Sequence, residues 1–312
     1  HENNRVFRDV AEVGEILAKL DDVIGTTVRP EVAVVYDWEN RWAIDAAAGP
    51  RKERKDYLET CQRHYLPFWS AGVSVDVIDQ TVSLDGYKLV IAPMSYLLRP
   101  GFAQRVEKFV QGGGTFVTTY WSGIVNETDL VFTGGWPGPL RKLLGVWVEE
   151  MDVLHDGERN TVVPSPGNAL GLSAVYKAEV FCDLLHAESA DVLATYGEQF
   201  YAGWPALTVN RFGSGRAYYI ASRNEDAMLT AFYGRLIQEL GLKRVMKADL
   251  PEGVTAQLRG DGKRQFVFLL NFKRCGWRID LAGEKFTDLL SGQAVEGAVD
   301  LAGCGSMVLE KR

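Results

Sequence analysis

Short apolar segments that alternate with helical patterns restrict the fold of this chain more than any other feature. Val32 to Tyr36 (VAVVY), Tyr87 to Pro93 (YKLVIAP) and Thr115 to Thr118 each lack the apolar–polar alternation of a half-exposed strand. Strands of this kind are covered on both faces, as in a parallel sheet with helices on each side. The first half of the chain therefore predicts an α/β sheet.

The rest of the chain divides into two further patterns. Helices are expected over residues 51–71, from Pro100 to about Gln111, and from Asp226 to Leu240. Strands paired by turns are expected between residues 146 and 221, and every segment after about Ala248 reads as a strand. We expect a mostly parallel α/β domain with helices on both faces over residues 30–247, and a small all-β domain over residues 248–312.

Residues 1–29 form a segment apart, a terminal helix and a linker. Apolar residues recur at helical spacing and predict an amphipathic helix, namely Val6, Phe7, Val10, Val13, Leu17 and Leu20. Such a stripe needs a partner surface. Because the first residue is His and the helix begins almost at once, we expect that the beginning of a longer polypeptide is missing.

Composition excludes several classes of function. A length of 312 residues suggests about two domains, and a net charge of −7 argues against a nucleic-acid partner. No apolar run is long enough to predict a membrane span. Four cysteines lie far apart without a C-x-x-C motif, which suggests buried structural thiols in a reducing, cytoplasmic compartment. We predict no metal and no cofactor.

The stretch from Gly112 to Glu127 carries the position at which α/β enzymes often place their chemistry. Three glycines end a helix, a strand follows, and Thr119-Tyr120-Trp121-Ser122-Gly123 comes at its carboxyl end. Many α/β enzymes hold a Ser or Cys nucleophile on that turn. No Gly-x-Ser-x-Gly or Gly-x-Cys-x-Gly is present, so the turn is predicted to lack a nucleophile.

One pair of carboxylates could support hydrolysis. Asp37 and Glu39 lie two apart after a strand and could share a face, as retaining glycosidases require of carboxyl groups about 5–5.5 Å apart. The alternative is that Asp37 caps or turns the chain while Glu39 bonds Arg41 or a backbone amide. The spacing favours this structural alternative.

Two cysteine–histidine pairs have the spacing of helix neighbours. Cys61 and His64, and also Cys182 and His186, could be thiolate–imidazole pairs or halves of a zinc site. Two ligands do not complete a tetrahedral site, and an activated Cys usually lies on a tight turn or a helix start. We therefore interpret both pairs as structural.

Aromatic residues gather where the chain leaves the strands. Trp38, Trp42, Tyr120, Trp121 and Trp136 are expected in loops beyond strand ends. Exposed indoles are costly, so another surface is expected to cover them. Packing at the edge of the core, a subunit interface and a platform for a sugar all remain open.

Together, these segments resemble the rear part of the glycoside hydrolase family 42 β-galactosidases. The segments that carry the resemblance are YDWENRWA (Tyr36–Ala43), HYLPFWSAGVSVDVI (His64–Ile78), YKLVIAPMSYLLRPG (Tyr87–Gly101), GGGTFVTTYWSGIVNETDLVF (Gly112–Phe132), GGWPGPLRKLLGVWVEEMD (Gly134–Asp152) and RFGSGRAYYIAS (Arg211–Ser222). The order and spacing of these segments are those of the family, and they cover essentially the whole chain.

The resemblance implies a fold and a division of labour. In that family an N-terminal (β/α)8 barrel carries the two catalytic glutamates. A middle domain resembles the glutamine amidotransferases, with a flavodoxin-like sheet but no nucleophilic Cys, and it holds a homotrimer together. A small β domain ends the chain. Residues 1–29 resemble the last helix of the barrel, and neither catalytic glutamate has a counterpart here.

This chain is therefore expected to be inactive alone, with no catalytic residue of its own and with the missing barrel of the same polypeptide as a partner. A galactoside would be bound only by the intact enzyme. Trp38, Trp42, Tyr120 and Trp121 are the residues expected at a subunit interface or at the wall of an active site. The alternatives are a stand-alone carbohydrate-binding or oligomerisation module and, third, a small hydrolase that uses Asp37 and Glu39.

Overall fold

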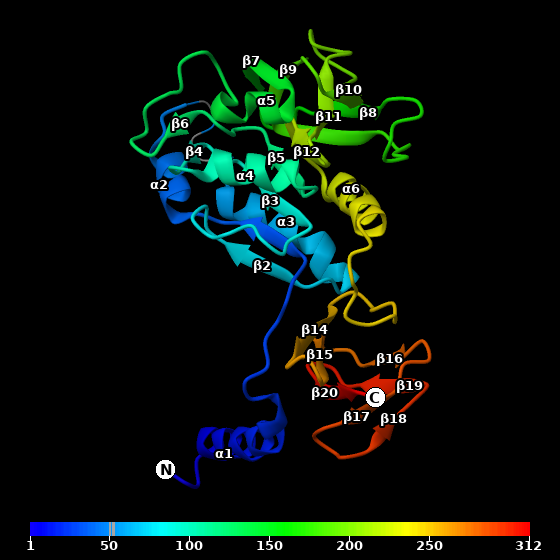
Figure 1. Ribbon diagram of the computed structural model, residues 1–312. Coiled ribbons are helices and arrows are strands. Elements are labelled where there is room, and N and C mark those ends of the chain that lie inside the picture. Colours follow the sequence, from blue (N-terminus) through cyan, green and yellow to red (C-terminus); the bar gives the residue numbers. More distant parts are fainter. Residues whose placement is uncertain (50, 52–53) are drawn as a thin grey trace. The chain divides into compact units, whose positions relative to one another are not determined.

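The structure is a computed structural model that describes residues 1–49, 51 and 54–312. The chain forms two compact units. The α/β unit comprises Glu31–Pro67 and Val75–Leu242, and the β unit comprises His1–Pro30, Phe68–Ser74 and Lys243–Arg312. Figure 1 shows the elements of both.

The first half of the α/β unit is the parallel sheet that the apolar segments predict. Its strands are β1 (Val32–Val35), β2 (Val75–Ile78), β3 (Leu89–Ala92) and β5 (Thr115–Thr119). They lie in the order β5-β3-β1-β2, and each neighbouring pair is parallel. Every residue of β1, β3 and β5 is buried, as expected of strands covered on both faces.

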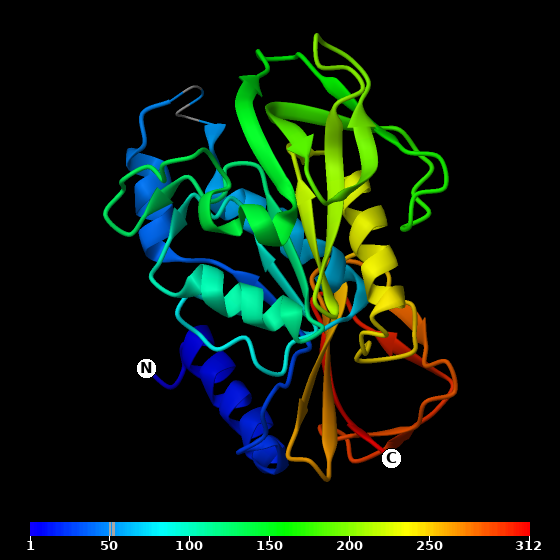
Figure 2. The same cartoon turned by 45° about the horizontal axis from the view of Figure 1, so that its top comes forward.

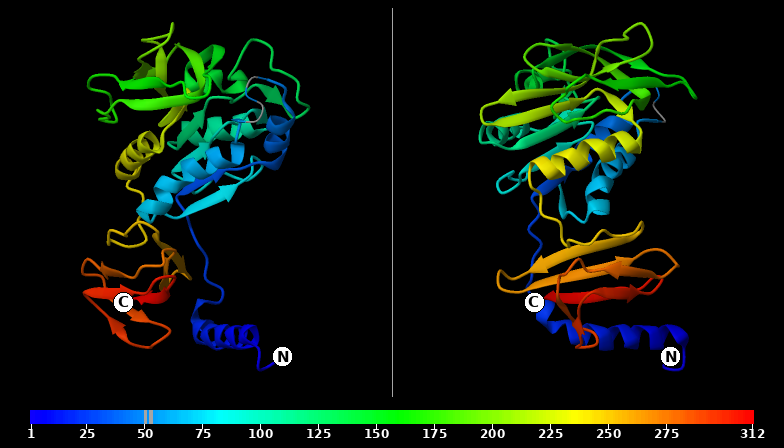
Figure 3. Two further views of the ribbon diagram at one scale, coloured as in Figure 1. Left: turned by 180° about the vertical axis from the view of Figure 1, so that it is seen from behind. Right: turned by 90° about the vertical axis from the view of Figure 1, so that its right-hand side faces the viewer.

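Helices cover both faces of this sheet. They are α3 (Tyr57–Ala71), α4 (Phe102–Gln111) and α6 (Asp226–Glu239), whereas α2 (Trp38–Ala46) lies beyond the carboxyl end of β1. Figure 2 shows α4 on the near face, and the rear view of Figure 3 shows α3 and α6 on the other. The helix predicted over residues 51–71 begins later, at Tyr57, and its residues 52 and 53 lie outside the described part of the chain.

The second half of the sheet is antiparallel, so the prediction of a mostly parallel sheet is wrong there. Its strands are β7 (Val146–Val153), β8 (Asn160–Pro164), β9 (Tyr176–Ala187), β10 (Asp191–Tyr196), β11 (Pro205–Phe212), β12 (Gly215–Ile220) and β13 (Ser222–Asn224). β12 joins the halves, because it pairs with β5 in parallel and with β11 antiparallel. A two-residue turn, Gly213-Ser214, connects β11 to β12, and so short a connection makes only antiparallel neighbours.

Smaller elements surround the sheet. They are the strands β4 (Leu97–Leu98) and β6 (Val125–Asn126), the 3-10 helix η3 (Gly138–Leu140) and the short helix α5 (Arg141–Leu144). β4 and β6 pair in parallel. Their residues Leu97 and Val125 pack with Ala43 of α2 in a small apolar cluster.

The β unit contains two antiparallel sheets. The strands are β14 (Val254–Gly260), β15 (Gln265–Asn271), β16 (Trp277–Asp280), β17 (Phe286–Asp288), β18 (Ala294–Val295), β19 (Ala298–Leu301) and β20 (Ser306–Lys311). Five form the sheet β14-β15-β20-β17-β18, and β16 pairs with β19. The predicted hairpin at Asp261-Gly262 is confirmed, since the Asp261 carboxylate accepts the backbone N–H groups of Lys263 and Arg264.

The predicted N-terminal helix is confirmed as α1 (Arg5–Leu17), followed by the 3-10 helix η1 (Ala18–Val23). Asn4 caps it through a hydrogen bond from the backbone N–H of Val6 to the Asn4 side chain. Its apolar stripe is more than half exposed, at Val6, Phe7, Val10, Val13 and Leu17. None of the helices in the described residues is long and apolar enough to span a membrane.

The prediction of buried thiols holds for two of the cysteines only. Cys61 and Cys182 are buried inside the α/β unit. Cys275 and Cys304 are exposed, and there the prediction is wrong. Both lie in turns of the β unit, outside any strand, where no layer covers them.

Candidate functional site

The turn at the carboxyl end of β5, residues 119–123, contains a residue with a side chain in the left-handed conformation; we call it the Trp121 turn. Trp121 has φ of +59° and Gly123 has φ of +66°. A positive φ is uncommon for a residue with a side chain, and it marks the sharp turns that display nucleophiles after a strand. A Cβ at Gly123 would lie 2.2 Å from the carbonyl oxygen of Pro137, so only glycine fits there.

The Trp121 indole seals this turn. Only 5% of the residue is exposed. Its ring centroid lies 5.4 Å from that of Tyr96 and 5.8 Å from that of Phe181, and its Nε1–H donates to the sulfur of Met151 over 2.7 Å. The Lys55 ammonium lies 5.0 Å from the ring centroid, in a cation–π contact. The indole is thus enclosed by side chains of the α/β unit.

A buried carboxylate lies against the same turn. Asp183, in the middle of β9, is completely buried and accepts the Tyr219 hydroxyl over 2.6 Å. Its other oxygen, Oδ1, is buried and has no hydrogen-bond partner among the described residues. Burial raises the pKa of Asp183 to about 7, although the Tyr219 hydroxyl and the Trp121 backbone N–H act to lower it. A carboxylate of the chain therefore lies against the backbone of the Trp121 turn.

Tyr120 is also buried, and it is held by an arginine that the sequence analysis missed. Arg223, from β13, is only 6% exposed and donates from Nε to the Tyr120 hydroxyl over 2.9 Å. The same guanidinium donates to the backbone carbonyls of Arg54 and Lys55 and pairs with Asp56. These partners precede α3, so Arg223 fastens that part of the α2–α3 connection to the sheet.

Trp38 and Trp42 lie on α2, and the prediction that they lie in loops is wrong. Asp37 starts the helix, because its Oδ1 accepts the backbone N–H groups of Glu39 and Asn40 over 2.9 and 3.2 Å. Trp38 and Trp42 are one turn apart on the same face, with ring centroids 6.2 Å apart. They are 55% and 62% exposed, so the described part of this chain leaves more than half of each residue accessible.

Lys55 contacts both the carboxyl end of α2 and the Trp121 ring. Its ammonium donates to the backbone carbonyls of Ile44 and Ala47 at the end of α2. It also lies over the Trp121 ring. Lys55 therefore links the carboxyl end of α2, the helix that carries Trp38 and Trp42, to the buried Trp121 ring.

The carboxylate pair is a structural feature and not a glycosidase pair. Asp37 is completely buried, and its Oδ2 accepts the backbone N–H of Gln80 over 3.1 Å. Arg99 lies 3.5 Å from Asp37 and 3.1 Å from Glu39. Because a cap and an arginine take up the oxygens of Asp37, the capping alternative is confirmed, with Arg99 rather than Arg41 as the partner of Glu39.

The cysteine–histidine pairs are also structural. Burial raises the pKa of Cys61 to about 12 and lowers the pKa of His64 to about 3, so neither group carries charge at neutral pH. Burial likewise raises the pKa of Cys182 to about 12. His186 bonds Glu149 and stacks on Trp147. No group of three or more metal-ligating side chains occurs in the described part of the chain.

Comparison with known proteins identifies the family of this chain. Residues 30–243 match the family described as the β-galactosidase trimerisation domain, and residues 253–311 match the β-galactosidase C-terminal domain. β-Galactosidase Pbg of Clostridium perfringens is 53% identical over 312 residues, which are 100% of this chain and 45% of that protein.

Two solved structures are similar over the whole chain. The β-galactosidase from Rahnella sp. R3 has 47% identity and a TM-score of 0.93, and the chain covers 45% of it. The β-galactosidase from Bacillus circulans sp. alkalophilus has 40% identity and a TM-score of 0.95, and the chain covers 46% of it. The chain thus spans less than half the length of each of these three relatives. It belongs to the β-galactosidases of glycoside hydrolase family 42, and it matches their trimerisation and C-terminal domains.

Proposed function

We propose that this chain assembles the subunits of a β-galactosidase and leaves the cleavage of the substrate to the rest of the polypeptide. Residues 1–29 would be the last helix of a catalytic barrel and its linker, residues 30–247 the trimerisation domain, and residues 248–312 the small β domain. The limited coverage supports this division, since the chain accounts for only 45% of a relative that is 53% identical.

The trimerisation domain is proposed to descend from an amidotransferase-like fold. The support is the Trp121 turn, which follows a parallel strand and holds Trp121 at φ of +59° where such enzymes hold a nucleophile. Within the intact enzyme, two barrel glutamates would hydrolyse terminal β-D-galactosides with retention. Neither would come from this chain.

The observation that carries the assembly role is the exposed pair Trp38 and Trp42 on α2. Trp is enriched at the energetic centre of protein interfaces, and the described part of the chain leaves two indoles on one helix face more than half exposed. Capping by Asp37 and Lys55 fixes both ends of this helix. Tyr120 and Trp121 would support this surface indirectly, because Tyr120 binds Arg223 and Trp121 contacts Lys55. We propose a homotrimer, in which each subunit offers this surface to a neighbour.

Light scattering on the purified chain tests the assembly. The unmodified chain is expected to have the mass of a trimer. The double variant Trp38→Ala, Trp42→Ala is expected to have a lower mass. Phe200→Ala is the matched control, because Phe200 is 74% exposed in the same unit but far from α2 in sequence. A double variant that remains trimeric, or an unmodified chain that is monomeric at all concentrations, would contradict the proposal.

A turnover assay tests the absence of catalysis. The chain alone is expected to release no product from a chromogenic β-galactoside. Turnover that disappears in Glu39→Gln would instead place a catalytic carboxylate on α2 and would overturn the assignment.

A further inference from the structure

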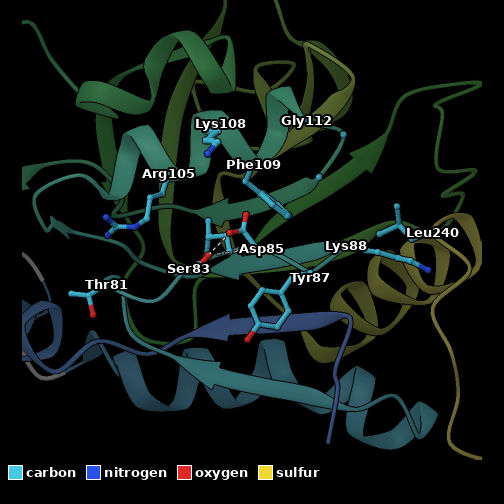
Figure 4. Close-up of a pocket in the computed structure, with 14 residues that line it drawn as sticks. Thr81, Ser83, Asp85, Tyr87, Lys88, Arg105, Lys108, Phe109, Gly112 and Leu240 are labelled. Atoms are coloured by element: carbon cyan, nitrogen blue, oxygen red, sulfur yellow. Dashed lines mark hydrogen bonds between the residues drawn. The ribbon is translucent and has the colours of Figure 1, made fainter. Parts of the chain in front are cut away.

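A pocket lies at the edge of the α/β unit opposite the Trp121 turn, where β3 and β5 begin. Its volume is about 790 Å³, within the range of small-molecule sites. Figure 4 shows side chains of α4 on one wall, Arg105, Lys108 and Phe109, and the loop between β2 and β3 on the other. The glycine turn that ends α4 and Leu240 at the end of α6 complete the lining.

In the wall of this pocket, the ring of Phe109 packs closely against the backbone of Gly114. A Cβ added to Gly114 would lie 2.4 Å from the ring of Phe109, so only glycine lets the ring close over the backbone. Gly113 beside it has φ of +107°, which other residues rarely adopt. The hollow is therefore a fixed feature of the fold.

The pocket is positively charged, although the chain has a net charge of −7. Three of its lining residues are basic, Lys88, Arg105 and Lys108, and one is acidic, Asp85. Lys88 pairs with Glu31 over 2.8 Å. Asp85 accepts the Ser83 hydroxyl over 2.8 Å and has no ion pair among the described residues. Arg105 and Lys108 of α4 thus line the hollow without an ion pair to any carboxylate that the structure describes.

Arg105 and Lys108 differ in how many of their hydrogen-bond donors have a partner in the described part of the chain. Arg105 donates one bond to the backbone carbonyl of Gln80, and its Nε is buried without an acceptor among the residues described. For Lys108, one turn further along α4, the described residues supply no hydrogen bond or ion pair to the ammonium. Guanidinium and ammonium groups bind phosphate and carboxylate oxygens through charge-assisted hydrogen bonds.

We propose that this pocket binds a small anion, a phosphate or a carboxylate, through Arg105 and Lys108. Ser83 and Asp85 on the opposite wall can bond a hydroxyl group of the same ligand. Trp38 and Trp42, the residues proposed for subunit assembly, do not line this pocket, so the proposed site is additional to that surface.

Isothermal titration of the chain with inorganic phosphate and, separately, with citrate tests the site and distinguishes the two anion types. Ionic strength is held constant with sodium chloride. At least one anion is expected to bind saturably with one site per chain. Arg105→Gln and Lys108→Gln are each expected to weaken binding at least about tenfold, the effect of losing one charge-assisted hydrogen bond.

Lys263→Gln is the matched control, since it removes one positive charge from an exposed turn of the β unit and should leave binding unchanged. Lys108 is exposed, so its variant tests the site even if Arg105→Gln fails to fold. Absence of saturable binding by both anions would refute the proposal. So would equal affinity in the unmodified chain and Lys108→Gln, because the anion would then bind elsewhere.

Discussion

Replacing Asp183 with asparagine should change how the stability of the chain depends on pH. The Asp183 carboxyl is completely buried beneath the Trp121 turn, and its Oδ1 has no partner among the described residues. The groups that face it are the Tyr219 hydroxyl and the Trp121 backbone N–H. These do not offset the loss of water, so the folded chain holds the proton up to a pKa of about 7.

The sign and size of the effect follow from this difference. An unfolded chain releases the proton near pH 3.8, whereas the folded chain keeps it until about pH 7. Between these pH values the carboxyl is ionised only in the unfolded chain, which favours unfolding. The stability that Asp183 contributes below pH 4 is therefore lost as the pH rises to about 7. The whole change is worth roughly 4 kcal/mol of unfolding free energy. Asparagine does not ionise, so Asp183→Asn should lack this decrease.

Urea unfolding followed by tryptophan fluorescence at pH values from 4 to 8 measures the difference. The unfolding free energy of Asp183→Asn minus that of the unmodified chain should rise by roughly 4 kcal/mol across the range, because contributions of other groups cancel. Asp76→Asn is the matched control, since Asp76 accepts the Tyr87 hydroxyl over 2.8 Å at a half-exposed position. A difference that stays constant between pH 4 and 8 would refute the reasoning.

Three further outcomes are expected. Trp121→Ala should lower the unfolding free energy by about 3–5 kcal/mol, as measured by urea unfolding, because it leaves a cavity under the turn. Arg223→Met should cost about 3 kcal/mol in the same assay, since the Tyr120 hydroxyl and two backbone carbonyls lose a buried donor; an unchanged midpoint would contradict that network. A thiol reagent should label two cysteines in the folded chain and four after unfolding, the first two being Cys275 and Cys304.

The parallel half of the sheet was predictable because its signal is local. An unbroken apolar run such as VAVVY is itself the consequence of being covered on both faces, and β1 is buried at all four positions. The antiparallel half depends on pairing between distant strands. β9 contacts β7, β8 and β13, and no local pattern states which of these partners a strand will have.

The functional residues were predictable to different degrees. The absence of a nucleophile could be read directly from Thr119-Tyr120-Trp121. The helical position of Trp38 and Trp42 was missed although Asp37, a good N-cap, immediately precedes them. Asp183 had a visible signal, a lone acid within the buried run Val180 to Leu185, but Arg223 had none, because its partners lie more than 100 residues away.

The sealed Trp121 turn also limits which substitutions could place a catalytic group there. A single change of Trp121 to cysteine would place a thiol at a buried position, where the loss of water disfavours a thiolate. No histidine contacts the turn among the described residues, so a general base would have to arise at the same time. Each intermediate would also lose the packing of the indole. A catalytic thiol at this turn would therefore require several changes together, and the first of them would already destabilise the fold by removing the indole.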